Sequence, residues 1–563
     1  MPLPVERMLD RRRRLTHRAL PLGGLAAVAL AAGVGFGSAF EGGAERVATQ
    51  FAREWSAKDY TAMHRLLAPD VQARVPLAEF TAAYERAAGV ATAVVVQPGA
   101  SDGIGDGKVR VPVVVSTRLF GTIEGEVVLP VGEDEKVRWA PDLVFPGLSP
   151  GVELTRRVEL PRRAKILSRD GEVLAEGPAE ARTSPPDGVG SSIAGTVARS
   201  EDRDEREALF ARGFEKDTPV GTSGLERALQ RRVEGRPGGA LLAGSDVLAR
   251  SSPHADAPVR STIDSDIQAA AVSALAGRLG GIAALDPRTG EVRALAGVAF
   301  SAPQPPGSTF KLVTTTAALD NRLVKPSDEF EVASSALIDG VPLSNANGEL
   351  CGGTFSASFA HSCNSVFAPL GVKVGAERLV ATAERFGWNE EQTIAGAQES
   401  TLPKADEMTS PLEVGSSAIG QGRVLATPLE MASVAQTIAN GGVRETPSLL
   451  VGGPRQPRRV TSKQTARTIE RLMLGVVEYG TGTAAAIDGV KVAGKTGTAE
   501  LGDTRGPDAV ESDPSNTDAW FTSYAPAGKP EIVVAVLFVR NGAGGATAAP
   551  AAQPVLIAGL KDK

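Results

Sequence analysis

The sequence contains few histidines, and this shortage disfavours enzymes in which a histidine acts as the base that activates a nucleophile. Its four histidines are His17, His64, His254 and His361. A serine hydrolase with a histidine base needs one of them beside its nucleophile. His17 precedes the first apolar stretch, and His64 and His254 fall in regions without catalytic motifs. Only His361, next to Ser362, could act as a base, so a histidine-based triad is disfavoured.

The net charge is also small, and cysteines are few. A formal net charge of −6 over 563 residues does not indicate a surface for nucleic acid, so no nucleic-acid partner is expected. The two cysteines are Cys351 and Cys363. In an exported chain they could form one disulfide, worth about 3 kcal/mol. Two free thiols, one of them buried, are the alternative.

The N-terminus predicts export. Arg11 to Arg14 and Arg18 precede an apolar stretch over 19–40, and acidic residues follow it. Positive charge before the stretch places the N-terminus in the cytoplasm, and a helix over 19–40 would reach about 33 Å, enough to span a bilayer core of about 30 Å. We expect a single-pass anchor in the cell membrane, with the catalytic part outside. A signal peptide cleaved near Gly37-Ser38-Ala39 is the alternative.

A chain of 563 residues is too long for one core, so we expect a multidomain α+β protein. After a cytoplasmic tail and anchor over 1–43, the region 44–147 reads as helices followed by strands. The expected helices are 44–58, 60–67 and 77–88, and the expected strands are 91–97, 108–117 and 121–131.

The middle region, 148–257, is polar and rich in Pro and Arg. It predicts an elongated second domain with a hairpin around Arg169-Asp170-Gly171 and a disordered stretch over 183–192. The sequence pattern changes in the last region, 258–563, where an expected helix over 265–279 precedes five expected apolar strands. These strands are expected at 281–286, 291–296, 490–500, 519–524 and 531–539. Split around a helical block, they predict a five-stranded antiparallel sheet packed against helices.

Ser308 and Lys311 form an S-x-x-K pair whose spacing puts both side chains on one face of a helix. A serine hydroxyl is a poor nucleophile at neutral pH and needs a neighbouring base, which Lys311 could supply. Pro305-Pro306-Gly307 would end the preceding loop and leave Ser308 at the helix N-terminus, where free N–H groups favour an oxyanion. The pair alone occurs readily by chance.

Two further elements make the pattern specific. Ser362-Cys363-Asn364 is an S-x-N on an expected loop between helices, and Lys495-Thr496-Gly497-Thr498 lies on an expected strand. S-x-x-K, S-x-N and K-T-G in this order resemble the penicillin-binding proteins and serine β-lactamases. The flanks favour class B penicillin-binding proteins. They are Pro305 to Lys311, Gly420-Gln421-Gly422, Ala426-Thr427-Pro428, Trp520-Phe521 and Tyr524-Ala525-Pro526.

The resemblance covers most of the chain after the anchor. Residues 221–226 (GTSGLE) and 162–175 resemble the dimerisation, or pedestal, domain of class B members, although 163–166 reads Arg-Ala-Lys-Ile where Arg-Gly-x-Ile is usual. Residues 44–147 resemble the NTF2-like domain of a subset related to methicillin-resistance-type transpeptidases. The implied domains are therefore an NTF2-like domain (44–147), a pedestal (148–257) and a transpeptidase domain (258–563).

The resemblance implies a peptidoglycan D,D-transpeptidase in which neutral Lys311 activates Ser308 to attack the penultimate D-Ala of a stem peptide. Ser362 and Lys495 would pass a proton to the leaving D-Ala, and Asn364 would orient Lys311 and the substrate. The substrate-binding residues would be Thr496, Gly497 and Thr498. β-Lactams would acylate the same serine, and neither a cofactor nor a metal is required.

The resemblance further implies a separate membrane glycosyltransferase partner, because the region before the pedestal is too short for a glycosyltransferase domain. The alternatives are a D,D-carboxypeptidase, a β-lactamase, or a non-enzymatic β-lactam sensor or scaffold. A different motif overlaps the site: residues 489–496 fit G-x-x-x-x-G-K-T, the phosphate-binding loop of NTPases. That loop needs a following helix, and the sequence after Thr496 does not predict one.

Overall fold

The computed structural model describes residues 42–186, 188–502 and 514–560. The expected anchor or signal over 1–43 falls almost entirely outside these residues. Within the described part of the chain, each helix is too short or too polar to cross a bilayer. The chain divides into two compact units. One contains the chain up to Pro161 together with Glu201–Thr218 and Arg236–His254, and the other contains Arg162–Ser200, Pro219–Gly235 and Ala255 onward.

This division differs from the expected boundaries, because the region 148–257 does not form a unit of its own. Strands β5 (Leu154–Glu159), β10 (Gly238–Ala243) and β11 (Asp246–Ser251) form one antiparallel sheet in the first unit, which also takes α7 (Arg203–Ala211). The buried side chain of Leu241 on β10 joins the core of that unit. Such packing connects segments far apart in sequence, and composition does not reveal it.

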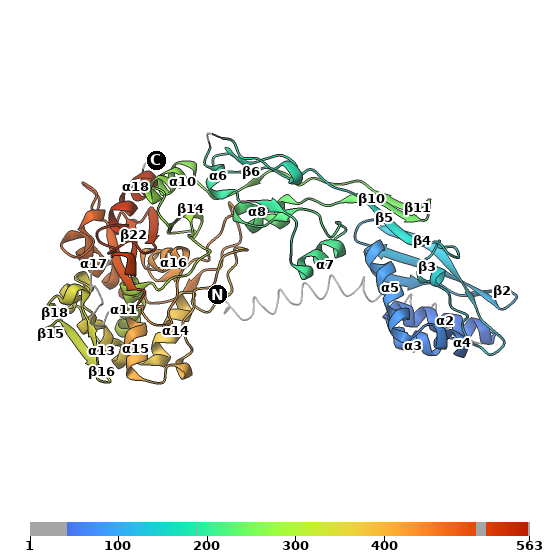
Figure 1. The fold of residues 1–563 in the computed structure, drawn as a ribbon, viewed down its shortest axis with the longest axis horizontal. Coiled ribbons are helices and arrows are strands. Elements are labelled where there is room, and N and C mark those ends of the chain that lie inside the picture. Colours follow the sequence, from blue (N-terminus) through green and yellow to red (C-terminus); the bar gives the residue numbers. More distant parts are fainter. Residues whose placement is uncertain (1–41, 187, 503–513, 561–563) are drawn as a thin grey trace, which may run out of the picture. The chain divides into compact units, whose positions relative to one another are not determined.

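The first unit has the predicted helix-then-strand order. Its helices are α2 (Gly43–Ala57), α3 (Tyr60–Arg65), α4 (Pro69–Arg74) and α5 (Leu77–Ala91), and its strands are β1 (Ala93–Pro98), β2 (Asp102–Gly105), β3 (Lys108–Thr117) and β4 (Thr122–Pro130). Strand β3 pairs antiparallel with β1, β2 and β4. Its alternate valines are buried against aromatic side chains of the helices, among them Phe51, Phe80 and Tyr84, and Figure 1 shows these helices grouped beside the sheet.

The second unit is built on the predicted five-stranded sheet. Its strands are β13 (Gly280–Leu285), β14 (Val292–Gly297), β21 (Ala493–Glu500), β22 (Thr517–Ala525) and β23 (Ile532–Phe538). Their order is β14-β13-β23-β22-β21, with every neighbouring pair antiparallel. Strand β23 is apolar and buried throughout because both faces of the sheet are covered. The prediction of this sheet is confirmed.

Helices cover the two faces of the sheet. Helices α10 (Ser265–Leu275) and α18 (Ala548–Leu560) pack on one face, and α16 (Pro428–Ala439) packs on the other. The inserted helical block, on the α16 side, also contains α11 (Lys311–Asp320), α12 (Phe355–Ala360), α13 (Asn364–Val374), α14 (Ala376–Phe386), α15 (Pro411–Ala418) and α17 (Lys463–Glu478). Figure 1 shows β15 (Glu329–Ala333), β16 (Ser335–Ile338) and β18 (Cys351–Thr354) at the outer side of this block, with β17 (Val341–Ser344) completing the group.

Segments of the middle region complete the second unit. The predicted hairpin at 169–171 joins β6 (Ile166–Leu167) to β7 (Val173–Ala175), and β12 (Val259–Arg260) pairs with β6. The stretch 183–192, expected to be disordered, leads into α6 (Gly190–Ile193). The remaining elements are β8 (Val197–Ala198), β9 (Val220–Gly221), α8 (Gly224–Ala228) and α9 (Gln230–Val233), with β19 (Val443–Arg444) and β20 (Arg458–Arg459) nearer the C-terminus.

A buried carboxylate holds these segments together. Glu226, the last residue of the GTSGLE motif, is fully buried and accepts hydrogen bonds from Arg163 and Arg182, each at 2.7 Å. Ala164, which stands where the related pattern has Gly, is also buried, and its carbonyl accepts a hydrogen bond from Arg182 at 2.6 Å. The departure from the family pattern is therefore accommodated by the local packing.

Candidate active site

Ser308 lies in a single turn of 3-10 helix, Gly307–Phe310, that runs directly into α11. Sequence reasoning placed Ser308 at the N-terminus of an α-helix, whereas the α-helix itself begins at Lys311. The Ser308 side chain is half-buried, and its hydroxyl makes no hydrogen bond with the described residues. Because the 3-10 helix runs directly into α11, Ser308 and Lys311 lie one turn apart on one continuous helical segment.

Three glycines fix this turn against its neighbours by contact between backbones. Gly307 has φ 51° and donates its N–H to the carbonyl of Gly420 at 2.9 Å. A Cβ on Gly307 would lie 2.6 Å from the carbonyl oxygen of Thr498, and a Cβ on Gly420 would lie 2.0 Å from that of Gly307. A Cβ on Gly497 would lie 2.8 Å from the carbonyl oxygen of Pro306. Only glycine permits these approaches.

Lys311 is completely buried. Its Nζ donates to the side-chain oxygen of Asn364 at 2.6 Å and to the backbone carbonyl of Ser362 at 2.7 Å, and the Ser362 hydroxyl lies at 3.3 Å. A neutral amine has two N–H donors, and the two short bonds use both of them. The lone pair is then left to accept a proton from a nearby hydroxyl.

Ser362 lies on the loop between α12 and α13, as predicted, and Asn364 is the first residue of α13. The backbone of Ser362 has φ 64°, in the left-handed region. Its hydroxyl also accepts a hydrogen bond from Lys495 Nζ at 2.8 Å. The structure thus brings S-x-x-K, S-x-N and K-T-G together around one hydroxyl.

Burial changes the proton affinity of both lysines. Burial first, and then the charge of Lys495, lowers the pKa of Lys311 well below the usual range of a lysine. Burial also lowers the pKa of Lys495, to about 7. Removing an ammonium from water disfavours its charged form, and a second ammonium nearby disfavours it further. The electrostatics therefore favour a neutral Lys311, and Lys495 titrates near pH 7.

The K-T-G residues lie on β21, an edge strand of the five-stranded sheet. Thr496 shares a short hydrogen bond with the hydroxyl of Thr481, and the Thr498 hydroxyl accepts one from the backbone N–H of Gly544 at 3.3 Å. Lys495 and Thr496 are in the middle of a strand, so residues 489–496 do not form a phosphate-binding loop, which would place them at the start of a helix.

Several residues of this neighbourhood were missed by sequence reasoning. The carbonyl of Ser344 accepts a hydrogen bond from the side-chain amide of Asn364 at 2.7 Å. Lys311 Nζ lies 5.1 Å from the ring centre of Phe367, and Thr481 contacts Thr496. None of these residues belongs to a motif, so the sequence carries no signal for them. The structure also joins Cys351 and Cys363 in a disulfide, one of the two alternatives left open.

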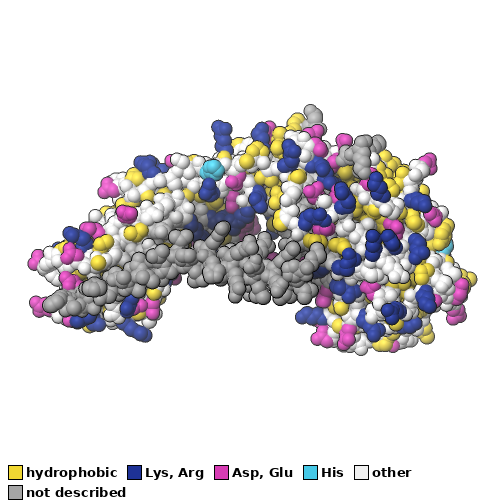
Figure 2. All heavy atoms as spheres, turned by 180° about the vertical axis from the view of Figure 1, so that it is seen from behind, with side chains coloured by type: hydrophobic (Ala, Val, Ile, Leu, Met, Phe, Trp, Pro, Cys, Tyr) yellow, Lys and Arg dark blue, Asp and Glu magenta, His cyan; other side chains and the backbone are white. Residues whose placement is uncertain are grey.

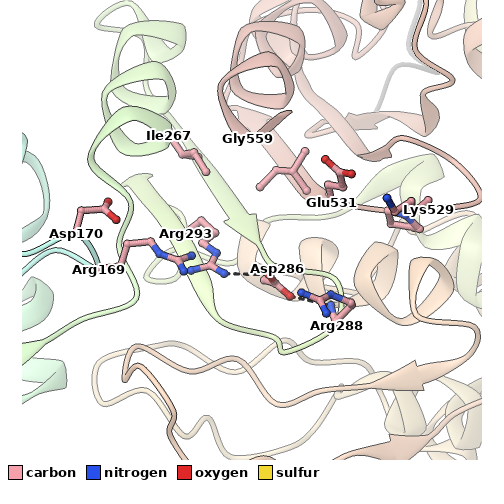
Figure 3. A pocket seen from close by; sticks show the side chains of 11 residues that line it. Arg169, Asp170, Ile267, Asp286, Arg288, Arg293, Lys529, Glu531 and Gly559 are labelled. Carbon is pink, nitrogen blue, oxygen red and sulfur yellow. Dashed lines mark hydrogen bonds and ion pairs between the residues drawn. The ribbon is translucent and has the colours of Figure 1, made fainter. Parts of the chain in front are cut away.

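A polar hollow of about 610 Å³ lies away from these motifs (Figure 3). It is lined by Arg169, Asp170, Asp286, Arg288 and Arg293, among others. Arg293 is 8% exposed, donates to Asp286 at 2.9 Å and forms an ion pair with Glu291 at 3.1 Å. Its charge is therefore neutralised in place, and no motif residue lines the hollow. It is not the site of the serine chemistry.

Figure 2 shows Lys and Arg side chains interspersed with Asp and Glu over the face that it presents. Among the described residues, His, Cys, Asp and Glu do not gather in groups of three that could hold a metal ion. The three-motif cluster is thus the candidate active site.

Comparisons with known proteins agree with this geometry. Residues 280–556 match the family model described as the penicillin-binding protein transpeptidase domain. The peptidoglycan D,D-transpeptidase PbpA of Mycolicibacterium smegmatis is 36% identical over 292 residues, which cover 47% of this chain and 56% of that protein. The match thus spans little more than half the length of this curated relative.

Solved structures match over a longer part of the chain. The D,D-transpeptidase domain of a peptidoglycan glycosyltransferase from Eggerthella lenta is 31% identical with a TM-score of 0.57, covering 72% of this chain and 99% of that one. The penicillin G acyl-enzyme complex of penicillin-binding protein A from M. tuberculosis is 27% identical with a TM-score of 0.56, covering 71% and 99%. The chain therefore belongs to the penicillin-binding protein family and carries a transpeptidase domain of the class B type.

Proposed function

We propose that this chain is a serine D,D-transpeptidase that cross-links peptidoglycan stem peptides and is acylated by β-lactams at Ser308. The observation that carries the proposal is the hydrogen-bonded cluster of Lys311, Ser362, Asn364 and Lys495, in which Lys311 follows the half-buried Ser308 by one helical turn. Relatives named D,D-transpeptidases and β-lactam acyl-enzyme structures support it.

In the proposed first step, the lone pair of Lys311 takes the proton of Ser308 as Oγ attacks the carbonyl carbon of the penultimate D-Ala. Burial keeps Lys311 neutral enough to act as the base. The backbone N–H groups of Ser308 and Thr498 would stabilise the oxyanion. The C–N bond then breaks, and the proton that Lys311 took passes through the Ser362 hydroxyl to the nitrogen of the leaving D-Ala. That hydroxyl lies 3.3 Å from Lys311 Nζ and 2.8 Å from Lys495 Nζ.

In the second step, an amine of a neighbouring stem peptide attacks the acyl-enzyme, forms the cross-link and returns the serine to its hydroxyl. Thr496 and Thr498 would bind the terminal carboxylate of the donor stem, and Lys495 would add positive charge below its pKa of about 7. Asn364 would orient both Lys311 and the substrate amide. Water in place of the amine would give carboxypeptidase activity.

The parts outside the transpeptidase domain complete the proposal. The helix-then-sheet order of α2–α5 and β1–β4 supports an NTF2-like domain, as in the subset related to methicillin-resistance-type enzymes. The basic and apolar N-terminal sequence supports a single membrane anchor with the catalytic domain outside the cell membrane. A membrane glycosyltransferase would then supply the glycan strands that this enzyme cross-links.

Labelling with fluorescent penicillin tests the proposal. The full chain should form a stable covalent adduct, and peptide mapping should place it on Ser308. The Ser308→Ala variant should fold and give no adduct, and an adduct that survives this change would refute the assignment. Rapid release of hydrolysed drug would instead identify a β-lactamase, because a transpeptidase acyl-enzyme deacylates slowly with water.

A further inference from the structure

A small β-sheet region between α11 and α12, here called the β insert (residues 329–354), contains none of the three motifs. It consists of two antiparallel pairs, β15 with β18 and β16 with β17. One end of the β insert nevertheless reaches the S-x-N loop, Ser362 to Asn364. Two separate attachments join them.

The first attachment is covalent. The disulfide links Cys351, the first residue of β18, to Cys363, the middle residue of S-x-N, with 5.4 Å between their Cα atoms. Cys363 is completely buried, and the Ser365 hydroxyl donates to the carbonyl of Cys351 at 3.2 Å. The bond therefore holds the backbone between Ser362 and Asn364 against the edge of the β insert.

The second attachment is Asn345, an asparagine that is 5% exposed. Its side-chain amide donates to the carbonyls of Ala333 at 2.7 Å and Glu349 at 2.9 Å, and its oxygen accepts the N–H of Ser365 at 2.9 Å. The same side chain thus joins two segments of the β insert to the first turn of α13.

Ser344, the residue before Asn345, contacts the side-chain amide of Asn364. The Ser344 carbonyl accepts from Asn364 Nδ2 at 2.7 Å, so the Asn364 oxygen faces Lys311, which it contacts at 2.6 Å. Ser362 meanwhile holds φ 64°, a conformation that costs free energy in a residue with a side chain and persists only where the surroundings impose it. The loop needs an external support, and the β insert contacts it at Cys363, Asn364 and Ser365.

We propose that the β insert positions the S-x-N loop for catalysis, with Asn345 and the Cys351–Cys363 disulfide as its two attachment points. Asn345 is a positioning residue that acts through Ser344 and Ser365, and the disulfide acts through Cys363. This inference rests on the proposed function, in which Ser362 and Asn364 act on a substrate at Ser308.

The test compares the wild-type protein with Asn345→Ala and with Cys351→Ser/Cys363→Ser. Stopped-flow labelling by fluorescent penicillin separates the acylation rate from the affinity that precedes it. We expect the acylation rate to fall about tenfold to a hundredfold, since small misplacements of catalytic groups have effects of this size. We also expect the pH at which acylation is half-maximal to move, because Lys311 loses a fixed acceptor.

Amide hydrogen exchange supplies a readout independent of activity. Exchange over 362–366 should accelerate in both variants, and exchange over 311–320 should stay unchanged. Asn440→Ala is the matched control, because Asn440 bonds the carbonyl of Val443 at 3.0 Å at the end of α16, outside the S-x-N loop and the β insert. If the double variant does not fold, mild reduction of the folded wild-type protein breaks the same bond.

The outcomes separate the two proposals. Unchanged acylation and unchanged exchange in the folded variants would overturn the positioning role, as would an equal loss in Asn440→Ala. A wild-type protein that is not acylated at Ser308 would refute the proposed function. The exchange of residues 362–366 would still decide whether the β insert supports the loop.

Discussion

The Nζ atoms of Lys311 and Lys495 both lie within hydrogen-bonding distance of the Ser362 hydroxyl, at 3.3 Å and 2.8 Å. Two ammonium groups this close to one oxygen repel each other, and burial removes the water that would screen them. The pKa of Lys311 falls further below its usual range because of the charge on Lys495. The arrangement assigns the proton to Lys495 and the lone pair to Lys311, which is the division of labour that acylation needs.

Replacing Lys311 should remove the base without removing the fold. We expect Lys311→Met to slow acylation by fluorescent penicillin about 10²–10⁴-fold. Lys311→Arg should not recover the rate, because a guanidinium stays protonated at every accessible pH. Lys373→Met, at an exposed lysine of α13, is the control. Acylation by Lys311→Arg at the wild-type rate would exclude Lys311 as the base.

The stability of the transpeptidase domain should rise with pH above neutrality in a way that depends on Lys495. Its folded pKa is lowered to about 7 from 10.5. Between these values the unfolded chain binds more protons than the folded one, so the free energy of unfolding increases with pH. The contribution of one such lysine is about 1.4 kcal/mol per pH unit.

Chemical denaturation at pH 7.5 and pH 9 tests this sign. The wild-type protein should gain stability relative to Lys495→Met as the pH rises, because methionine has no proton to lose. A stability difference that stays constant over this range would show that the two states bind protons at Lys495 equally.

The glycines behind the nucleophile allow a matched comparison. Gly420 and Gly422 have φ 74° and 71°, but a Cβ on Gly420 would lie 2.0 Å from the Gly307 oxygen, whereas one on Gly422 would have no atom within 4 Å. Gly422→Ala should cost about 1–2 kcal/mol, the cost of a left-handed alanine. Gly420→Ala should cost more and should also slow acylation. Equal effects in thermal unfolding and labelling would contradict the packing described.

The buried carboxylate of Glu226 should be far more important for stability than an exposed one nearby. Glu226→Gln leaves Arg163 and Arg182 buried without their counter-charge, and we expect a loss of about 3–5 kcal/mol. The control is Glu176→Gln, which breaks the exposed pair with Lys165 in the same region and should cost about 0–1 kcal/mol. Calorimetry of the two variants measures the difference, and similar losses would refute the burial argument.

The sequence predicted the parts of the structure that depend on local pattern. Apolar runs marked the five strands, including the continuous apolar run of β23, and the three motifs named residues that the fold brings together. It did not predict the 3-10 turn at Ser308, which follows from backbone contacts with Gly420 and Thr498. Neither could it assign Ser344 and Asn345, because their importance depends on which loop happens to lie beside them.

The middle region shows the same limit on a larger scale. Its composition predicted one domain, yet β5, β10 and β11 belong to the first unit, whereas β6, β7 and α8 belong to the second. Strand pairing between segments separated by many residues decides this division. A single sequence contains no periodicity that reports such pairing.

The contacts among Gly307, Gly420 and Gly497 have a consequence for drug escape. Around these glycines main chain touches main chain, so the local shape does not depend on rotamers and any side chain there would clash with a backbone oxygen. The S-x-N loop, in contrast, is held by side-chain hydrogen bonds and a disulfide from the β insert. Selection for reduced β-lactam acylation should therefore yield substitutions around the S-x-N loop and its supports, and should spare the three glycines.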